Sequence, residues 1–425
     1  MEDCLRQQIR DLIQREVVVA TGCTEPGAVA LTVAKARETL GSMPEQTTLL
    51  LSKNVFKNAM GVGIPGTGMV GLPIAVAIAL TGGDSRRMLE ILTIPAATID
   101  AAKAWLANNG DRIKIGLKEN CEDKLYIECI CQKGGDKATA IISKRHTNFV
   151  YIARNDNVIL DEESCGSASD AEHSSETALS ERIVFEYATT APIEEIQFIR
   201  DTIELNSAAA NEGLKGYGLN TGKILMENAE GDIVHTVIAR TVAASDARMD
   251  GCTLPVYSNS GSGNQGIACT LPIYEYGRAK NCSEEQVTRA LILSHLTSIY
   301  VKRGIGRLSA LCGIVNASIG VTSGITYLHG GNYEQVCYAI KNMINTLAGM
   351  VCDGAKPSCA LKMSTGLYSA FVSAELALHD KVVDACDGLS EKDIDYSIRN
   401  LGRLGHDGMD QTDDVVLDIM THKQN

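Results

Sequence analysis

The sequence predicts an α+β fold, in which a smaller α+β domain with an antiparallel or mixed sheet accompanies a larger, mostly helical catalytic domain. Strand-like alternation is concentrated between residues 47 and 165, whereas helical periodicity dominates from residue 181 onward. The chain has 425 residues, which is more than one compact core usually holds, so more than one domain is expected.

Two helices are predicted before the first strand. Apolar residues at helical spacing run through residues 2–19, and a second helix, AVALTVAKARETL, follows the stretch TGCTEPG. We therefore assign residues 1–46 to N-terminal helices and expect them to pack on the helical domain.

The α+β domain is assigned to residues 47–180. It begins with the strand TTLLLSKNVF, a Gly-rich turn and the apolar helix LPIAVAIAL, and residues 88–107 also have a helical pattern. Four strand segments follow, with turns at GGD and NDN: DRIKIGLKE, KLYIECICQ, KATAIISKRH and NFVYIARNDNVIL. The polar, Ser-rich stretch 161–177 indicates a linker or exposed loop that closes the domain.

The helical domain is assigned to residues 181–425. Helical periodicity is clear in PIEEIQFIRDTIELNSAAANEGL, SEEQVTRALILSHLTSIYVKR, YEQVCYAIKNMINTLAGM and LYSAFVSAELALHDKVV. Ser283 and Gln286 form a predicted capping box at the start of the second of these helices. Aromatic residues are only 4% of the chain and glycine is frequent, so small side chains should let the helices pack closely.

Composition excludes several classes of partner. The formal net charge of −13 predicts no binding to nucleic acid or to an anionic membrane, because both would repel this surface. No apolar run approaches the roughly 18 residues of a membrane-spanning helix, and MEDCLRQQIRDLIQ lacks an apolar signal core. We expect a cytoplasmic protein, and we leave open whether it is a homodimer.

Most of the 14 cysteines are expected to be buried free thiols, because a reducing compartment disfavours disulfides. Cys352 and Cys359 are different, since they flank the turn of MVCDGAKPSC. Their separation is wider than in most structural zinc sites, whereas thiolate ligands of iron–sulfur clusters have more varied spacing. Cys312 is the favoured third thiol, and the alternatives Cys282 and Cys337 have more structural surroundings.

Cys23 is a candidate base or nucleophile. If Thr24 caps the second helix, Cys23 lies at a helix N-terminus, where the dipole favours a thiolate and lowers the pKa. The alternative interpretation is a buried structural cysteine.

Two polar loops are candidates for substrate binding. Gly66, Thr67 and Gly68 begin a G-x-G-x-x-G pattern, but the units around it do not alternate as a dinucleotide-binding domain requires. A tight turn or a backbone-amide cradle for a small anion is favoured instead, and Asn58 just before it would suit that cradle.

The second loop is YSNSGSGNQGI, residues 257–267, in which neutral hydrogen-bonding groups are crowded between glycines. Ser260, Ser262 and Asn264 could hold the carboxylate and amine of a substrate. An ordinary flexible turn is the alternative interpretation.

Together, the motifs TGCTEP, KNAMGVGIPGTG, NSGSGNQG and MVCDGAKPSCALK resemble those of the L-cysteine desulfidase family. This family is related to the catalytic, alpha part of the iron–sulfur L-serine dehydratases, and the resemblance covers nearly the whole chain. It implies a [4Fe–4S] cluster on Cys312, Cys352 and Cys359, with one iron open to substrate and no pyridoxal phosphate. It also implies that Cys23 is the proton acceptor.

The activity implied by the resemblance is elimination of hydrogen sulfide from L-cysteine, which yields pyruvate and ammonia. L-serine dehydration at the same site is an alternative, because nothing in the sequence distinguishes oxygen from sulfur at the β-carbon. An alternative of another class is a non-catalytic iron–sulfur sensor. The polar Gly-rich loops favour an enzyme with a small amino-acid substrate over that sensor.

Overall fold

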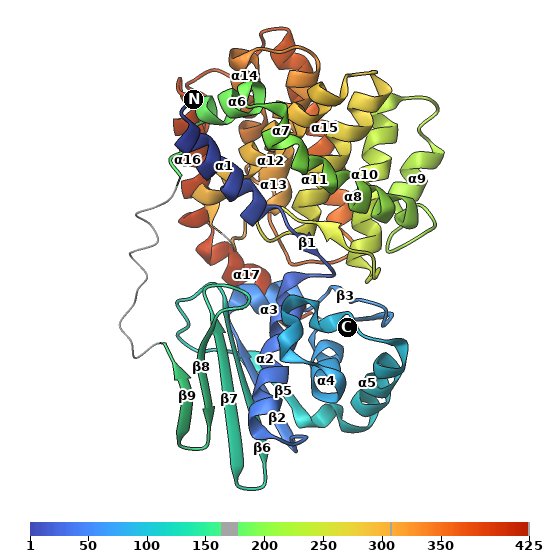
Figure 1. Ribbon diagram of the computed structural model, residues 1–425, viewed down its shortest axis with the longest axis vertical. Coiled ribbons are helices and arrows are strands. Elements are labelled where there is room, and N and C mark those ends of the chain that lie inside the picture. The colour runs from blue at the N-terminus through green and yellow to red at the C-terminus, as the bar shows by residue number, and fades with distance from the viewer. Residues whose placement is uncertain (163–176, 307, 424–425) are drawn as a thin grey trace.

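The protein has two parts, each built around its own hydrophobic core (Figure 1). The computed structural model describes residues 1–162, 177–306 and 308–423. A mixed sheet with helices forms the smaller part, and helices form the larger part, so the predicted α+β fold is confirmed. The linker predicted at 161–177 lies almost entirely outside the described residues.

The sheet of the smaller part has six strands in the spatial order β5-β2-β6-β7-β8-β9 within the described residues. Strands β2 and β5 are parallel, and every other neighbouring pair is antiparallel. The strands are β2 (Gln46–Leu51), β5 (Ile113–Leu117), β6 (Tyr126–Lys133), β7 (Asp136–Ser143), β8 (Phe149–Arg154) and β9 (Asn157–Asp161).

The turns predicted at GGD and NDN are confirmed as the β6–β7 and β8–β9 hairpins. Gly134 and Asn155 begin these turns with φ angles of 56° and 52°. Glycine and asparagine adopt this left-handed region more readily than other residues, which explains their use here.

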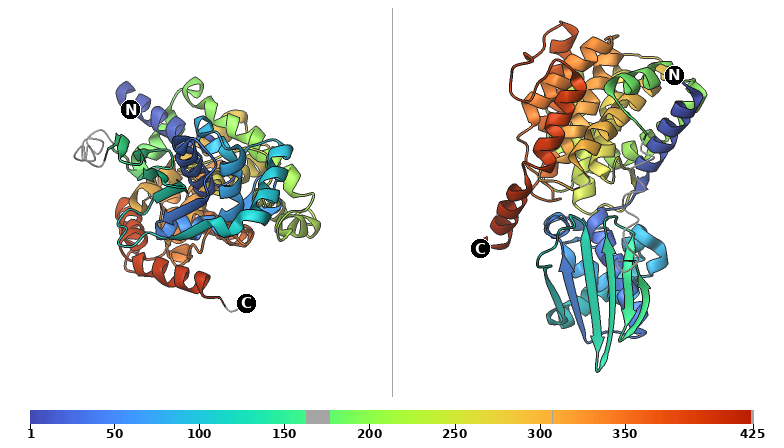
Figure 2. Two further views of the ribbon diagram at one scale, coloured as in Figure 1. Left: turned by 90° about the horizontal axis from the view of Figure 1, so that it is seen from below. Right: turned by 90° about the vertical axis from the view of Figure 1, so that its left-hand side faces the viewer.

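Helices cover one face of the sheet, as the side view in Figure 2 shows. They are α2 (Thr24–Leu40), α3 (Lys53–Ala59), α4 (Leu72–Gly82) and α5 (Ala96–Asn109), with the 3₁₀ turns η1 (Ser85–Leu92) and η2 (Gly110–Arg112). Helix α2 contacts β6, β7 and β8, and its buried side chains belong to the core of this part. Residues 1–46 therefore do not pack as one unit on the helical part, because most of α2 is buried in the core of the sheet-containing part. The domain boundaries stay a prediction.

The helix predicted over residues 88–107 is interrupted. Met88 has a φ of 51°, so residues 85–92 are a kinked 3₁₀ turn, and α5 begins only after Pro95. Proline disfavours helical geometry at the residue before it, which separates the two segments.

The larger part contains α1 (Asp3–Glu16) and the helices after residue 180, with α13 in contact with four neighbours. These helices are α6 (Glu181–Thr190), α7 (Ile193–Ile196), η4 (Gln197–Arg200), α8 (Asp201–Gly213), α9 (Thr221–Glu227), α10 (Ile233–Met249), α11 (Gly263–Ala279), α12 (Glu284–Ile305), α13 (Gly313–Leu328), α14 (Tyr333–Leu347), α15 (Cys359–Leu378), α16 (Ile394–His406) and α17 (Asp410–Thr421). None of the described helices is both long and apolar enough to cross a bilayer.

Close helix packing and the capping box are both confirmed. A Cβ atom on Gly320 of α13 would lie 2.2 Å from the carbonyl oxygen of Ser294 on α12, so only glycine permits this approach. Ser283 and Gln286 make both hydrogen bonds of the capping box at the start of α12.

The C-terminal helix α17 connects the two parts, because it packs against α3 of the smaller part. Lys57 of α3 forms a buried ion pair with Asp413, and Asn54 Nδ2 donates to the same carboxylate at 2.7 Å. Nearby, Lys53 pairs with Asp414, but both of these side chains are about half exposed.

We expect Asp413→Ala to lower the free energy of unfolding by about 3–5 kcal/mol, because it leaves the Lys57 ammonium buried without its partner. Asp414→Ala is the matched control and should cost about 1 kcal/mol or less, because its ion pair is exposed to solvent. Chemical denaturation of both variants measures the difference. Equal losses would contradict a special role for the buried pair.

Candidate active site

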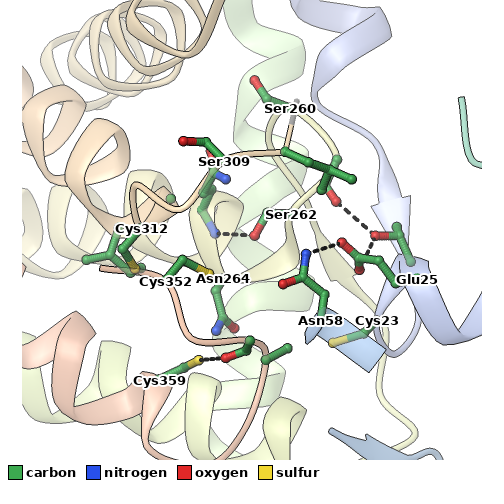
Figure 3. Close-up of a pocket in the computed structure, with 18 of the residues that line it drawn as sticks. Cys23, Glu25, Asn58, Ser260, Ser262, Asn264, Ser309, Cys312, Cys352 and Cys359 are labelled. Carbon is green, nitrogen blue, oxygen red and sulfur yellow. Dashed lines mark hydrogen bonds between the residues drawn. The ribbon is translucent and has the colours of Figure 1, made fainter. Parts of the chain in front are cut away.

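One pocket lies where the two parts meet, and it collects most of the predicted site residues (Figure 3). Its volume is about 130 Å³, which suits a small molecule. The predicted residues that line it are Cys23, Asn58, Ser260, Ser262, Asn264, Cys312, Cys352 and Cys359.

Cys312 and Cys352 are brought together by a short antiparallel bridge between Leu311 and Val351. The Cys312 amide donates to the Met350 carbonyl at 2.9 Å, and the Cys352 amide donates to the Ala310 carbonyl at 2.6 Å. These bonds hold two segments that lie 40 positions apart in the chain, so backbone pairing sets the proximity of the two thiols.

Cys359 begins α15 at the end of the loop that carries Cys352. Its thiol donates to the Gly354 carbonyl at 3.7 Å. Gly354 has a φ of 92°, and a Cβ there would lie 2.3 Å from the Lys57 carbonyl oxygen, so this loop sits directly on α3. Glycine is required at this position for both reasons.

Asp353 stiffens the same loop by pairing with Lys356 and Lys362. Partial burial would raise the pKa of Asp353, but hydrogen bonds from the two lysines outweigh it and lower that pKa to about 2. Lys362 also donates to the Val351 carbonyl at 2.7 Å, which ties α15 to the bridge beside Cys352.

Cys23 reaches the pocket through a second short pairing. Strand β1 (Val19–Ala20) is antiparallel to β10 (Val256–Tyr257), and the Ser260 amide donates to the Glu16 carbonyl at 3.0 Å. The start of α2 is thereby placed beside the polar loop 257–267. Cys23 itself is the N-cap of α2, so the prediction that Thr24 caps this helix is wrong by one residue.

The pKa of Cys23 is raised to about 11, opposite to the direction predicted from its helix position. Burial is the largest cause, since it disfavours the charged thiolate. Arg248 acts against it by charge and by a hydrogen bond with the thiol, whereas Glu25 and Cys359 raise the pKa further. Desolvation therefore outweighs the helix dipole.

Four helices direct their N-termini at this pocket. Cys23, Ser262 and Cys312 are the N-caps of α2, α11 and α13, and Cys359 is the first residue of α15. Each N-terminus carries partial positive charge and free backbone N–H groups. The four helix ends therefore favour a bound anion such as a carboxylate.

The surroundings of two of the three thiols of the helical part raise their pKa. Burial first, and then the proximity of Cys352, raises the pKa of Cys312 to about 12. Burial likewise raises the pKa of Cys359. Within the described residues no three His, Cys, Asp or Glu side chains are arranged for a single metal ion. A four-iron cluster places each thiolate on a different iron, so its ligands stand further apart than those of one ion.

Gly66, Thr67 and Gly68 do not line the pocket. They form the turn between β3 (Gly63–Ile64) and β4 (Met69–Val70), and the Thr67 hydroxyl donates to the Ile64 carbonyl at 2.7 Å. Since this hydroxyl also accepts from the Met69 amide at 3.0 Å, it closes its own hairpin. The geometry matches a tight turn and does not support a substrate cradle at these three residues.

Three charged residues of the pocket, Glu25, Arg248 and Lys302, are absent from the set predicted from the sequence. Glu25 accepts a hydrogen bond from Asn58 Nδ2 at 3.0 Å. It stands two positions after Cys23, and this closeness in the sequence could have marked it as a site residue. Arg248 donates to Asn264 Oδ1 at 3.2 Å and to the Gly22 carbonyl at 2.9 Å. It comes from α10, where no motif marks it.

A family model described as "Serine dehydratase alpha chain" matches residues 138–418. The chain belongs to the serine dehydratase alpha chain family. This is a family of lyase-type enzymes with iron–sulfur sites. The matched segment contains the three cysteines of the helical part and the loop 257–267, whereas Cys23, Glu25 and Asn58 precede it.

Several relatives match the chain over almost its whole length. A UPF0597 protein of Phocaeicola vulgatus is 54% identical over 99% of this chain and 98% of its own. A UPF0597 protein of Bacteroides fragilis is 52% identical over all of both chains. One of Aeromonas hydrophila is 43% identical over 97% of this chain and 95% of its own.

Proposed function

We propose that this protein is an iron–sulfur-dependent lyase that eliminates hydrogen sulfide from L-cysteine to give pyruvate and ammonia. The observation that carries the proposal is the gathering of Cys312, Cys352 and Cys359 on one pocket that Cys23 also lines. The family to which the chain belongs supports the coarser statement, a serine dehydratase-like iron–sulfur enzyme.

The residues fit a [4Fe–4S] cluster by their chemistry. Three soft sulfur donors share one pocket, and none of them is in a disulfide. The raised pKa values of Cys312 and Cys359 mean that binding of positively charged iron would release protons and stabilise the thiolates. Cys312, Cys352 and Cys359 would hold the cluster, and the fourth iron would have no ligand from these three residues.

The chemical requirements divide between the cluster and the protein. When bound, the cluster supplies a Lewis-acidic iron with affinity for the departing sulfur. Cys23, once deprotonated, takes the proton from Cα, and Arg248 stabilises its thiolate by charge and a hydrogen bond. Loss of the Cα proton and of the β-sulfur, which leaves as hydrogen sulfide, gives aminoacrylate. Tautomerisation and addition of water then give pyruvate and ammonia, without pyridoxal phosphate.

A second candidate is dehydration of L-serine at the same site, which the name of the family favours. The two reactions differ only in the β-substituent, so the same Cys23 base would serve both. Turnover of L-cysteine and L-serine by one preparation distinguishes them.

The test is reconstitution of the protein with iron and sulfide under anaerobic conditions. We expect a broad visible absorption band, and release of sulfide and pyruvate in equal amounts from L-cysteine. The iron-free protein is the control and should be inactive. Full turnover without bound iron would refute the proposal, and faster pyruvate formation from L-serine would favour the second candidate.

A further inference from the structure

Arg248 is a buried cation that pairs with no carboxylate among the described residues. Its exposed fraction is 7%, and no carboxylate forms an ion pair with it in residues 1–162, 177–306 and 308–423. Its Nη1 and Nη2 atoms donate to an amide oxygen and a backbone carbonyl, and its buried Nε has no hydrogen-bond partner in those ranges. A buried charge without a counter-ion is costly, so the site favours an anion.

The position of Arg248 strengthens this preference. A Cβ on Gly263 would lie 2.2 Å from Arg248 Nε, so the guanidinium group packs directly against the first residue of α11. The N-terminus of a 17-residue helix is the positive end of its dipole, where a second positive charge is unfavourable. A carboxylate bound there would satisfy both the guanidinium group and the helix end.

A complementary pair of acceptors, Glu25 and Asn58, lines the same pocket. Glu25 is half-buried and accepts hydrogen bonds from Asn58 Nδ2 and Thr24 Oγ1, both at 3.0 Å. Because Asn58 donates through its nitrogen, its Oδ1 remains as an acceptor, and this buried atom has no partner in the described chain. Figure 3 shows Asn58 and Glu25 together at the pocket with Cys23. A carboxylate and a free amide oxygen suit an ammonium group.

We infer that Arg248 binds the α-carboxylate and that Glu25 with Asn58 binds the α-ammonium group of the substrate. The pocket then selects α-amino acid zwitterions, and simple thiols or thiol acids are poor ligands. The inference rests on the proposed function for its substrate. It also gives a reason for the place of Cys23, which interacts with both Arg248 and Glu25, because the α-carbon is bonded to both charged groups.

Three probes separate the two subsites by binding, measured calorimetrically on the anaerobically prepared full-length protein. L-alanine carries both charged groups, 3-mercaptopropionate lacks the ammonium group, and cysteamine lacks the carboxylate. Arg248→Gln should weaken the binding of L-alanine and 3-mercaptopropionate by about 10- to 100-fold, because it removes hydrogen bonds to a charged group. The binding of cysteamine should not change. Glu25→Gln should weaken L-alanine and cysteamine and leave 3-mercaptopropionate unchanged.

Control variants distinguish a loss of ligand contacts from a general loss of structure. Arg240→Gln removes another partly buried arginine of α10, which pairs with Glu275 away from the pocket, and it should leave all three probes unaffected. Asn58→Ala should act in the same direction as Glu25→Gln, since it removes the free acceptor. If Arg248→Gln fails to fold, Arg248→Lys is the variant to test, because lysine keeps the positive charge but lacks the planar guanidinium group. Only the probes that carry a carboxylate should then bind more weakly.

The outcomes distinguish this inference from the proposed function. Wild-type protein that binds L-alanine but releases no sulfide from L-cysteine would refute the function and leave the subsites standing. Equal weakening of all three probes by Arg248→Gln would overturn the carboxylate assignment. Unchanged binding of L-alanine by Arg248→Gln would also overturn the carboxylate assignment, because Arg248 would then not contribute to holding the carboxylate.

Discussion

Replacement of Cys359 by alanine should abolish both iron binding and turnover. The proposed cluster has three protein thiolates, and the variant would leave only Cys312 and Cys352 to hold it. Cys359 begins α15 and lines the pocket, where Cys23 from the start of α2 is the lining cysteine that is not among the three proposed ligands. Iron content per chain, the visible spectrum and sulfide release should fall to the level of the iron-free protein.

The control variants are Cys337→Ala and Cys282→Ala. Both cysteines are alternatives from the sequence, but neither lines the pocket, and the Cys337 thiol interacts with Tyr333 within the helical core. Both variants should keep their iron. If Cys359→Ala bound as much iron as the wild type, or if Cys337→Ala lost it, the proposed ligand set would be wrong.

Cys23→Ala should keep its iron and lose turnover by about 10²- to 10⁴-fold, the range typical of a missing general base. The side chain lines the same pocket but belongs to the start of α2, next to the β1–β10 pairing. Iron content should therefore match the wild type while sulfide release falls. Binding of L-alanine should persist, since Cys23 is not one of its proposed anchors.

Two results would contradict this role for Cys23. Loss of iron in Cys23→Ala would make Cys23 a ligand, and unchanged turnover would assign the base to another group. Cys252→Ala is the matched control, because Cys252 is also buried with a pKa raised mainly by burial, yet it does not line the pocket.

Local patterns were sufficient for most of the fold. The alternation in KATAIISKRH, the Gly-Gly and Asn-Asp turns and the capping box of Ser283 each depend on residues within a few positions of one another. Such interactions involve only neighbouring residues, so the sequence is enough to predict them. The burial of α2 on the sheet could not be read in this way, because contacts with distant segments decide it.

The candidate site also combines features that the sequence reveals with features that only the fold creates. Cysteines and polar loops stand out by residue type, so the sequence offers Cys312, Cys352, Cys359 and Cys23 as candidates, and the resemblance implies their roles. Arg248 could not be selected in this way, because an arginine on a helix is ordinary until its surroundings bury it. The sequence left both a tight turn and an anion cradle open at Gly66 and Gly68, because a Gly-rich turn has the same composition whether or not it holds a ligand.

The sequence by itself determined which elements form and which thiols are available, since helix periodicity, strand alternation and turn residues act over short distances. Only the tertiary structure decided which of these groups share a pocket. The bridges Leu311–Val351 and β1–β10 join segments about 40 and 240 positions apart, and burial reverses the pKa shift that the helix dipole predicts for Cys23. Backbone pairing and desolvation depend on the whole fold, and no local pattern encodes either of them.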